Sequence, residues 1–166
     1  MSERGGDDLG KPGILHTTAP TATILIRVMV GAVFVSEGIQ KFLYPDSVGA
    51  GRFASIGIPS PEVMGPLVGV VEIVCGALVL IGLGTRLAVL PLIGVMLVAI
   101  VSTKIPILLG QDLGPFRLRS LDEYGFWTMA HESRTDFSML LGSLFLLVVG
   151  GGRWSMDAFL TSRDRA

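Results

Sequence analysis

The chain has 166 residues, of which 50% are hydrophobic and 16% are charged, and it contains one cysteine. About a quarter of the residues in a soluble domain are charged, so this composition points away from an ordinary soluble fold, and the apolar content excludes a disordered chain. The balance of 13 Lys and Arg against 14 Asp and Glu leaves no basic excess for nucleic-acid binding. A single cysteine excludes a disulfide framework and a cysteine-rich metal site.

The first 20 residues are polar and rich in glycine and proline. They lack the apolar stretch and the cleavage site of a signal peptide. We therefore expect a flexible N-terminal tail, followed by a first helix that stays in the membrane as a signal-anchor.

Four segments beyond the tail are long and apolar enough to cross a bilayer, which takes about 20 helical residues. They cover residues 22–43, 61–83, 86–109 and 133–150. Four such segments leave little chain for a soluble domain. The sequence therefore predicts an all-α polytopic membrane protein, with a four-transmembrane-helix bundle in residues 21–152 and a cytoplasmic C-terminal tail in residues 153–166.

Local signals place the ends of these helices. Pro45 ends the first helix, because proline cannot continue the helical hydrogen bonds. Ser60 followed by Pro61 is typical of an N-cap and a first helical residue. A turn around residues 82–85 connects the second helix directly to the third, so these two helices are expected to form an antiparallel hairpin. Ser133 and Asp136 fit a capping box at the start of the fourth helix.

A longer connection, residues 110–132, mixes aromatic and charged side chains between the third and fourth helices. Amphipathic aromatic residues are typical of the membrane interface. We expect a short interfacial helix or a cap over the mouth of the bundle, and a solvated loop is the alternative.

The distribution of Lys and Arg in the loops predicts the orientation. Four spans place both termini on one side, and that side carries more basic residues than the other. We therefore expect cytoplasmic termini in a cell membrane. The basic residues on the terminal side are Arg4, Lys11, Arg86, Arg153, Arg163 and Arg165, and those on the opposite side are Arg52, Arg117 and Arg119.

Ionisable residues within the spans suggest a site, because a charge in the hydrocarbon core costs several kcal/mol and by default faces the bundle interior. Glu37 and Lys41 are one turn apart on the first helix. Glu72 is predicted at a similar depth on the second helix. We interpret these three as a candidate catalytic polar pocket. Glu37 and Lys41 could instead form a structural ion pair.

Three more charged residues are predicted near the outer ends of the third and fourth helices: Lys104, Glu132 and Asp136. They are candidate substrate-binding residues. Alternatively, Lys104 could extend to the lipid head groups and Asp136 could serve only as the helix cap. Arg27 is expected to extend to the head groups on the cytoplasmic side.

Glycines on two helices predict close packing between them. Gly65, Gly69 and Gly76 share one stripe with Glu72, and Gly31 with Gly38 forms a second stripe on the first helix. Small residues at this spacing let helix backbones approach closely in lipid. Cys75 is interpreted as a small core residue, and no metal site is predicted.

The order of these motifs resembles the DoxX family of small four-helix membrane proteins. The matching residues in the first helix are Arg27, Phe34, Gly38 and Lys41. The second helix contributes Gly69, Glu72, Gly76, Leu78, Leu80 and Gly82, which Arg86 follows. The chain closes with Gly151, Gly152, Arg153, Trp154, Ser155 and Asp157. The resemblance implies a bacterial or archaeal membrane protein, in a family that includes small subunits of thiosulfate:quinone oxidoreductase.

Three functions are compatible with these features. The first hypothesis is a membrane subunit of a quinone-linked redox or thiol-stress complex, whose electrons come from a soluble or peripheral partner. The alternatives are a small proton-coupled transporter of a polar solute, which could require a homo-oligomer, and a non-catalytic scaffold that recruits proteins through residues 110–132. The lipid bilayer is a partner in each case, a quinone is the cofactor of the first, and no nucleic acid is expected in any.

Overall fold

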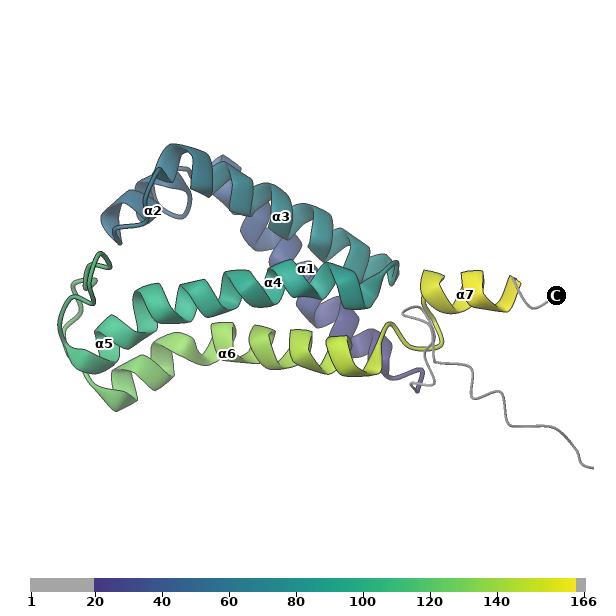
Figure 1. The fold of residues 1–166 in the computed structure, drawn as a ribbon. Coiled ribbons are helices and arrows are strands. Elements are labelled where there is room, and N and C mark those ends of the chain that lie inside the picture. The colour runs from purple at the N-terminus through teal and green to yellow at the C-terminus, as the bar shows by residue number, and fades with distance from the viewer. Residues whose placement is uncertain (1–19, 164–166) are drawn as a thin grey trace, which may run out of the picture.

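The computed structural model describes residues 20–163, and all regular elements within this range are helices (Figure 1). An isolated β-bridge joins Leu113 to Phe116. The predicted tail in residues 1–19 lies outside the described range. In chain order, the helices are α1 (Thr23–Leu43), α2 (Ala50–Ser55), α3 (Pro61–Ile81), α4 (Thr85–Ala99), the π-helix η1 (Ile100–Lys104), α5 (Ile105–Leu109), α6 (Phe126–Val149) and α7 (Met156–Arg163).

Three helical stretches are long and apolar enough to cross a membrane: Thr23–Leu43, Pro61–Ile81 and the continuous Thr85–Leu109. This confirms an all-helical membrane protein with several spans. Helix α6 has 24 residues, but its first half carries Glu132, Arg134 and Asp136, so it does not meet the same criterion. Because α6 packs beside α4 along the bundle, a fourth span remains our proposal.

The helices form two pairs that diverge like the arms of a V (Figure 1). Helix α1 packs most extensively on α3, and α4 packs on α6. The two pairs meet at the end where α1 begins, where the α3–α4 turn lies and where α7 follows α6. We call this the α7 end. At the opposite end, the α2 end, the pairs are apart.

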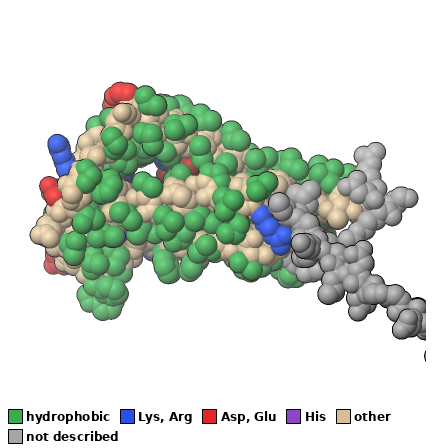
Figure 2. Space-filling model, in the orientation of Figure 1, with side chains coloured by type: hydrophobic (Ala, Val, Ile, Leu, Met, Phe, Trp, Pro, Cys, Tyr) green, Lys and Arg blue, Asp and Glu red, His purple; other side chains and the backbone are tan. Residues whose placement is uncertain are grey.

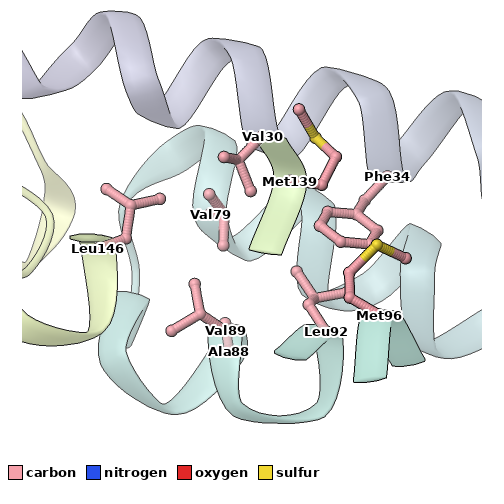
Figure 3. Close-up of a cluster of buried hydrophobic side chains, with 9 residues drawn as sticks. All are labelled: Val30, Phe34, Val79, Ala88, Val89, Leu92, Met96, Met139 and Leu146. Carbon is pink, nitrogen blue, oxygen red and sulfur yellow. The ribbon is translucent and has the colours of Figure 1, made fainter. Parts of the chain in front are cut away.

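The apolar core lies where the two pairs meet (Figure 3). All four long helices contribute to it. Burying these side chains against one another excludes lipid and solvent from the narrow part of the V. The core cluster consists of Val30, Phe34, Val79, Ala88, Val89, Leu92, Met96, Met139 and Leu146.

The predicted glycine contact between α1 and α3 is present. A Cβ added to Gly38 would lie 2.7 Å from the carbonyl oxygen of Gly69, and one added to Gly31 would lie 2.7 Å from that of Gly76. Real Cβ atoms do not approach that closely, so only glycine permits this helix separation. The close packing brings Glu72 toward α1.

The α3–α4 hairpin is also as predicted, with Gly82 and Gly84 in left-handed conformations at the two helix ends. Ser60 precedes α3 as expected, but its side chain makes no capping hydrogen bond. The residue adopts a left-handed backbone with φ of 50°. The position of the cap was therefore predicted correctly and its chemistry was not.

The expectation for Arg27 was wrong. Its side chain is only 2% exposed, and it donates to the carbonyl oxygens of Val79, Leu80, Gly151 and Trp154 instead of reaching the head groups. The physical reason is that the chain after α6 folds back over the α7 end. This return supplies carbonyl oxygens that satisfy a buried guanidinium.

The predicted C-terminal tail is attached to the bundle through Asp157. Its carboxylate is buried and accepts hydrogen bonds from the backbone N–H groups of Gly84 at 2.7 Å and Thr85 at 3.1 Å. These are unpaired donors at the start of α4, where a negative charge is favourable. The cap for α4 therefore comes from a segment more than 70 residues further along the chain.

The capping box at Ser133 was a wrong prediction. Helix α6 begins at Phe126, and the hydroxyl of Ser133 donates to the carbonyl oxygen of Met129 within the helix. The connection before it is a loop for the most part. The backbone N–H of Arg117 donates to the carbonyl oxygen of Ile56, which ties this loop to the segment after α2.

Candidate functional site

A cavity of about 490 Å³ lies between the two helix pairs in the wide part of the V. Figure 2 shows a hollow between the pairs, with acidic atoms inside it and hydrophobic side chains around its rim. Its walls are mainly aliphatic and aromatic. The charged residues that line it are Glu37, Lys41, Arg52, Glu72, Lys104 and Asp136.

One arm of the V contributes the ion pair between Lys41 and Glu72. The Nζ of Lys41 lies 2.6 Å from Oε2 of Glu72, and the two side chains are 9% and 3% exposed. Glu37 is not the ion-pair partner of Lys41, because only its backbone oxygen, at 3.5 Å, accepts from the lysine. The alternative of a Glu37–Lys41 ion pair was wrong. The glycine contact explains this, because it moves Glu72 within reach.

Glu37 itself lies at the edge of the cavity with an exposed side chain. Within residues 20–163, its carboxylate forms no ion pair. The structure therefore brings all three residues of the candidate pocket to one cavity. It divides them into a buried ion pair, Lys41 with Glu72, and a carboxylate at the rim.

The other arm contributes a second ion pair. The Nζ of Lys104 lies 3.1 Å from Oδ2 of Asp136 and donates to the backbone oxygen of Glu132 at 2.8 Å. Lys104 is buried, so it does not extend to the head groups. The carboxylate of Glu132 points elsewhere and lies 3.3 Å from Arg119 in the connecting loop. Glu132 does not line the cavity, whereas Lys104 and Asp136 do.

A π-helical turn sets the position of Lys104. The turn covers Ile100–Lys104, and the backbone N–H of Ile105 donates to the oxygen of Ile100, five residues earlier. Pro106 follows directly and has no N–H to donate. In an α-helix, the ring of a proline conflicts with the carbonyl oxygen four residues earlier, and the wider π turn separates the two. Such turns are frequent at functional sites. Pro106 was the signal in the sequence that could have indicated it.

The segment that covers the cavity at the α2 end was not predicted from the sequence. The short helix α2 contributes Arg52 and Phe53, and the residues after it contribute Ile56 and Ile58. The guanidinium of Arg52 forms no ion pair within the described part of the chain. Arg52 and Phe53, which follow Gly51, were the available signal, but six residues are too few for a clear helical pattern.

Comparison with known proteins shows the family of this chain. The family model described as DoxX matches residues 22–105, which include α1, α2, α3 and α4. The chain belongs to the DoxX family. The match ends before α6, so one of the two helices of the second arm lies outside it.

Two relatives extend over most of the chain. The "Uncharacterized membrane protein Rv3486" of Mycobacterium tuberculosis is 54% identical over 155 residues, which are 93% of this chain and 91% of the relative. The "Putative oxidoreductase CatD" of Bacillus subtilis is 27% identical over 138 residues, which are 83% of this chain and 86% of the relative. No solved structure matches.

Proposed function

We propose that this DoxX-family protein is a membrane subunit of a quinone-linked redox complex and that its cavity binds the quinone head group. The observation that carries this proposal is a cavity between the four long helices with mainly apolar walls and an ion pair on each arm. Its volume of about 490 Å³ lies within the range of about 300–1,000 Å³ that is usual for small-molecule sites.

The residues present suit such a head group. A quinone is a flat ring with two carbonyl oxygens, so the ring needs apolar contacts and the oxygens need hydrogen-bond donors. Phe34 and Met96 offer apolar surface, and the ammonium groups of Lys41 and Lys104 are donors in the same cavity. A hydrogen bond from a charged donor is worth more than one from a neutral group.

Reduction of a quinone to a quinol takes up two electrons and two protons. In this proposal, the electrons come from a soluble or peripheral redox partner. Glu37 and Asp136, the carboxylates that line the cavity with accessible surface, hold and deliver the protons. The relative that is named as an oxidoreductase supports a redox role for this family member.

A transport function has weaker support. A transporter needs access to its site from both faces of the membrane. Below the cavity, the α7 end is filled by Val30, Val79, Val89 and Leu146, all 0% exposed. Arg27 and the returning C-terminal segment cover this core. The closed end therefore favours a binding site with one accessible side.

The test is quinone binding by the purified protein in lipid nanodiscs, measured by calorimetric titration. The double variant Lys41→Met with Glu72→Gln removes both charges, so neither remains buried without a partner. We expect it to bind a short-chain quinone about tenfold more weakly or worse, since a hydrogen bond from a charged donor is lost.

Glu62→Gln is the matched control. Glu62 lies in the first turn of the same helix as Glu72, and its side chain is exposed outside the cavity. This variant is expected to bind as the wild type does. If the double variant is folded and inserted but binds with unchanged affinity, the proposed role of this ion pair is wrong.

A further inference from the structure

Some of the residues that line the cavity are exposed. They are Glu37, Gly94, Val98 and Thr135. Glu37 and Thr135 belong to α1 and α6, which have few contacts with each other. Gly94 and Val98 belong to α4. The exposed lining is therefore polar on the α1–α6 side and apolar on the α4 side.

The apolar part of this exposed lining lies deep in the predicted span. Gly94 is the tenth residue of the continuous Thr85–Leu109 span, so it lies about 14 Å along a helix that rises 1.5 Å per residue. This is close to the middle of the span. A Cβ added to Gly94 would meet nothing within 4 Å. The glycine therefore leaves open space where a side chain would stand, at a depth where the surroundings are lipid chains.

We propose that the cavity opens into the bilayer interior beside Gly94 and that its ligand has a polar head and a long apolar chain, with the chain leaving through this opening. The inference rests on the proposed function, because it describes how a quinone occupies the cavity. A lipid with an acyl chain has the same chemistry.

The positions of the charged residues relative to Gly94 fit a ligand with a polar head and an apolar chain. Lys104, which pairs with Asp136, lies ten residues beyond Gly94 on the same continuous helix, about 15 Å nearer the α2 end. Glu72 is nine residues from the α3–α4 turn, as Gly94 is, so these two residues lie at a similar depth. A head group held by Lys104 and Asp136 thus has its chain directed toward Gly94. Val68, Val95 and Val98 supply apolar lining along that route.

The experiment compares two probes in nanodiscs: a quinone with a decyl chain and the same ring without a chain. The variant Gly94→Phe fills the opening without a steric conflict at its Cβ. We expect the wild type to bind the decyl quinone more tightly than the chainless ring. Gly94→Phe is expected to weaken decyl-quinone binding by about tenfold, since the chain loses its buried position, and to leave binding of the chainless ring unchanged.

Leu90→Phe is the control, because Leu90 is exposed one turn earlier on the same helix and does not line the cavity. It should bind both probes as the wild type does. Equal affinity of the wild type for both probes, or unchanged decyl-quinone binding by Gly94→Phe, would overturn the proposal.

Native mass spectrometry of protein released from vesicles distinguishes the two candidate ligands, a quinone and a lipid with an acyl chain. A bound quinone mass supports both proposals. A bound phospholipid or fatty acid that Gly94→Phe loses, in the absence of quinone binding, supports the opening and refutes the quinone role. Retention of no chain-bearing molecule of either kind overturns the inference.

Discussion

Arg27 illustrates how a single buried charge can stabilise this fold. Its guanidinium connects α1 with the last turn of α3 and with the segment after α6 through four carbonyl oxygens. Arginine has five N–H donors in a fixed planar arrangement, so one side chain serves several acceptors at once. A Cβ on Gly82 would lie 2.6 Å from the guanidinium carbon, so this glycine leaves room for the arginine.

We predict that Arg27→Ala destabilises the protein by about 3 kcal/mol or more, because it leaves buried carbonyl oxygens without donors. Arg134→Ala is the control, since Arg134 is exposed and its guanidinium hydrogen-bonds only to His131, three residues earlier, within the described part of the chain. Its effect should stay within about 0.5 kcal/mol. Thermal unfolding in detergent measures both, and equal unfolding temperatures for the two variants would contradict the prediction.

At the scale of the helix, glycine has opposite roles at two positions. On α1, Gly38 is in contact with the backbone of α3, whereas Gly94 on α4 faces open space. Alanine has a higher helix propensity than glycine by about 1 kcal/mol. Whether the added methyl group meets a neighbouring atom therefore decides whether a Gly→Ala substitution lowers or raises the free energy of unfolding.

We predict that Gly38→Ala destabilises the protein by about 1–3 kcal/mol through overpacking. Gly94→Ala should be neutral or stabilising by up to about 1 kcal/mol from helix propensity. The two variants make the same chemical change, so each is the control for the other. Equal shifts of the unfolding temperature in detergent would show that packing against α3 does not restrict the size of the residue at position 38.

At the scale of the molecule, the V arrangement places both ends of the described chain at the α7 end (Figure 1). If α6 crosses the membrane, this end is on one side and the loop before α6 is on the other. From the excess of Lys and Arg on the terminal side we propose that the α7 end faces the cytoplasm.

We predict that cysteine labelling will show this orientation. In a Cys75→Ala background, Asp122→Cys in the loop should react with an impermeant maleimide added to intact cells, and Ser162→Cys on α7 should react only after the cells are opened. Both positions are exposed. Labelling of both from outside would mean that α6 does not cross, and the reverse pattern would mean an inverted orientation.

The sequence allowed the helical membrane fold, the α1–α3 contact and several cavity residues to be predicted. Hydropathy and glycine spacing are local patterns, and Lys41, Glu72, Lys104 and Asp136 were all identified as charges in or near apolar spans. The pairing of these charges was not predictable in the same way. Lys41 has Glu37 one turn away, but its partner is Glu72, 31 residues further along the chain.

Sequence alone therefore determined that the protein lies in a lipid bilayer and not in water, since bilayer insertion depends on the length and apolarity of each segment. It also determined which charges require an explanation. Only the tertiary structure decided that the two helix pairs diverge, that α2 covers the resulting cavity and that Arg27 is buried under the returning chain. These features depend on contacts between distant segments, and the free energy of such a contact is set by the groups that meet in space.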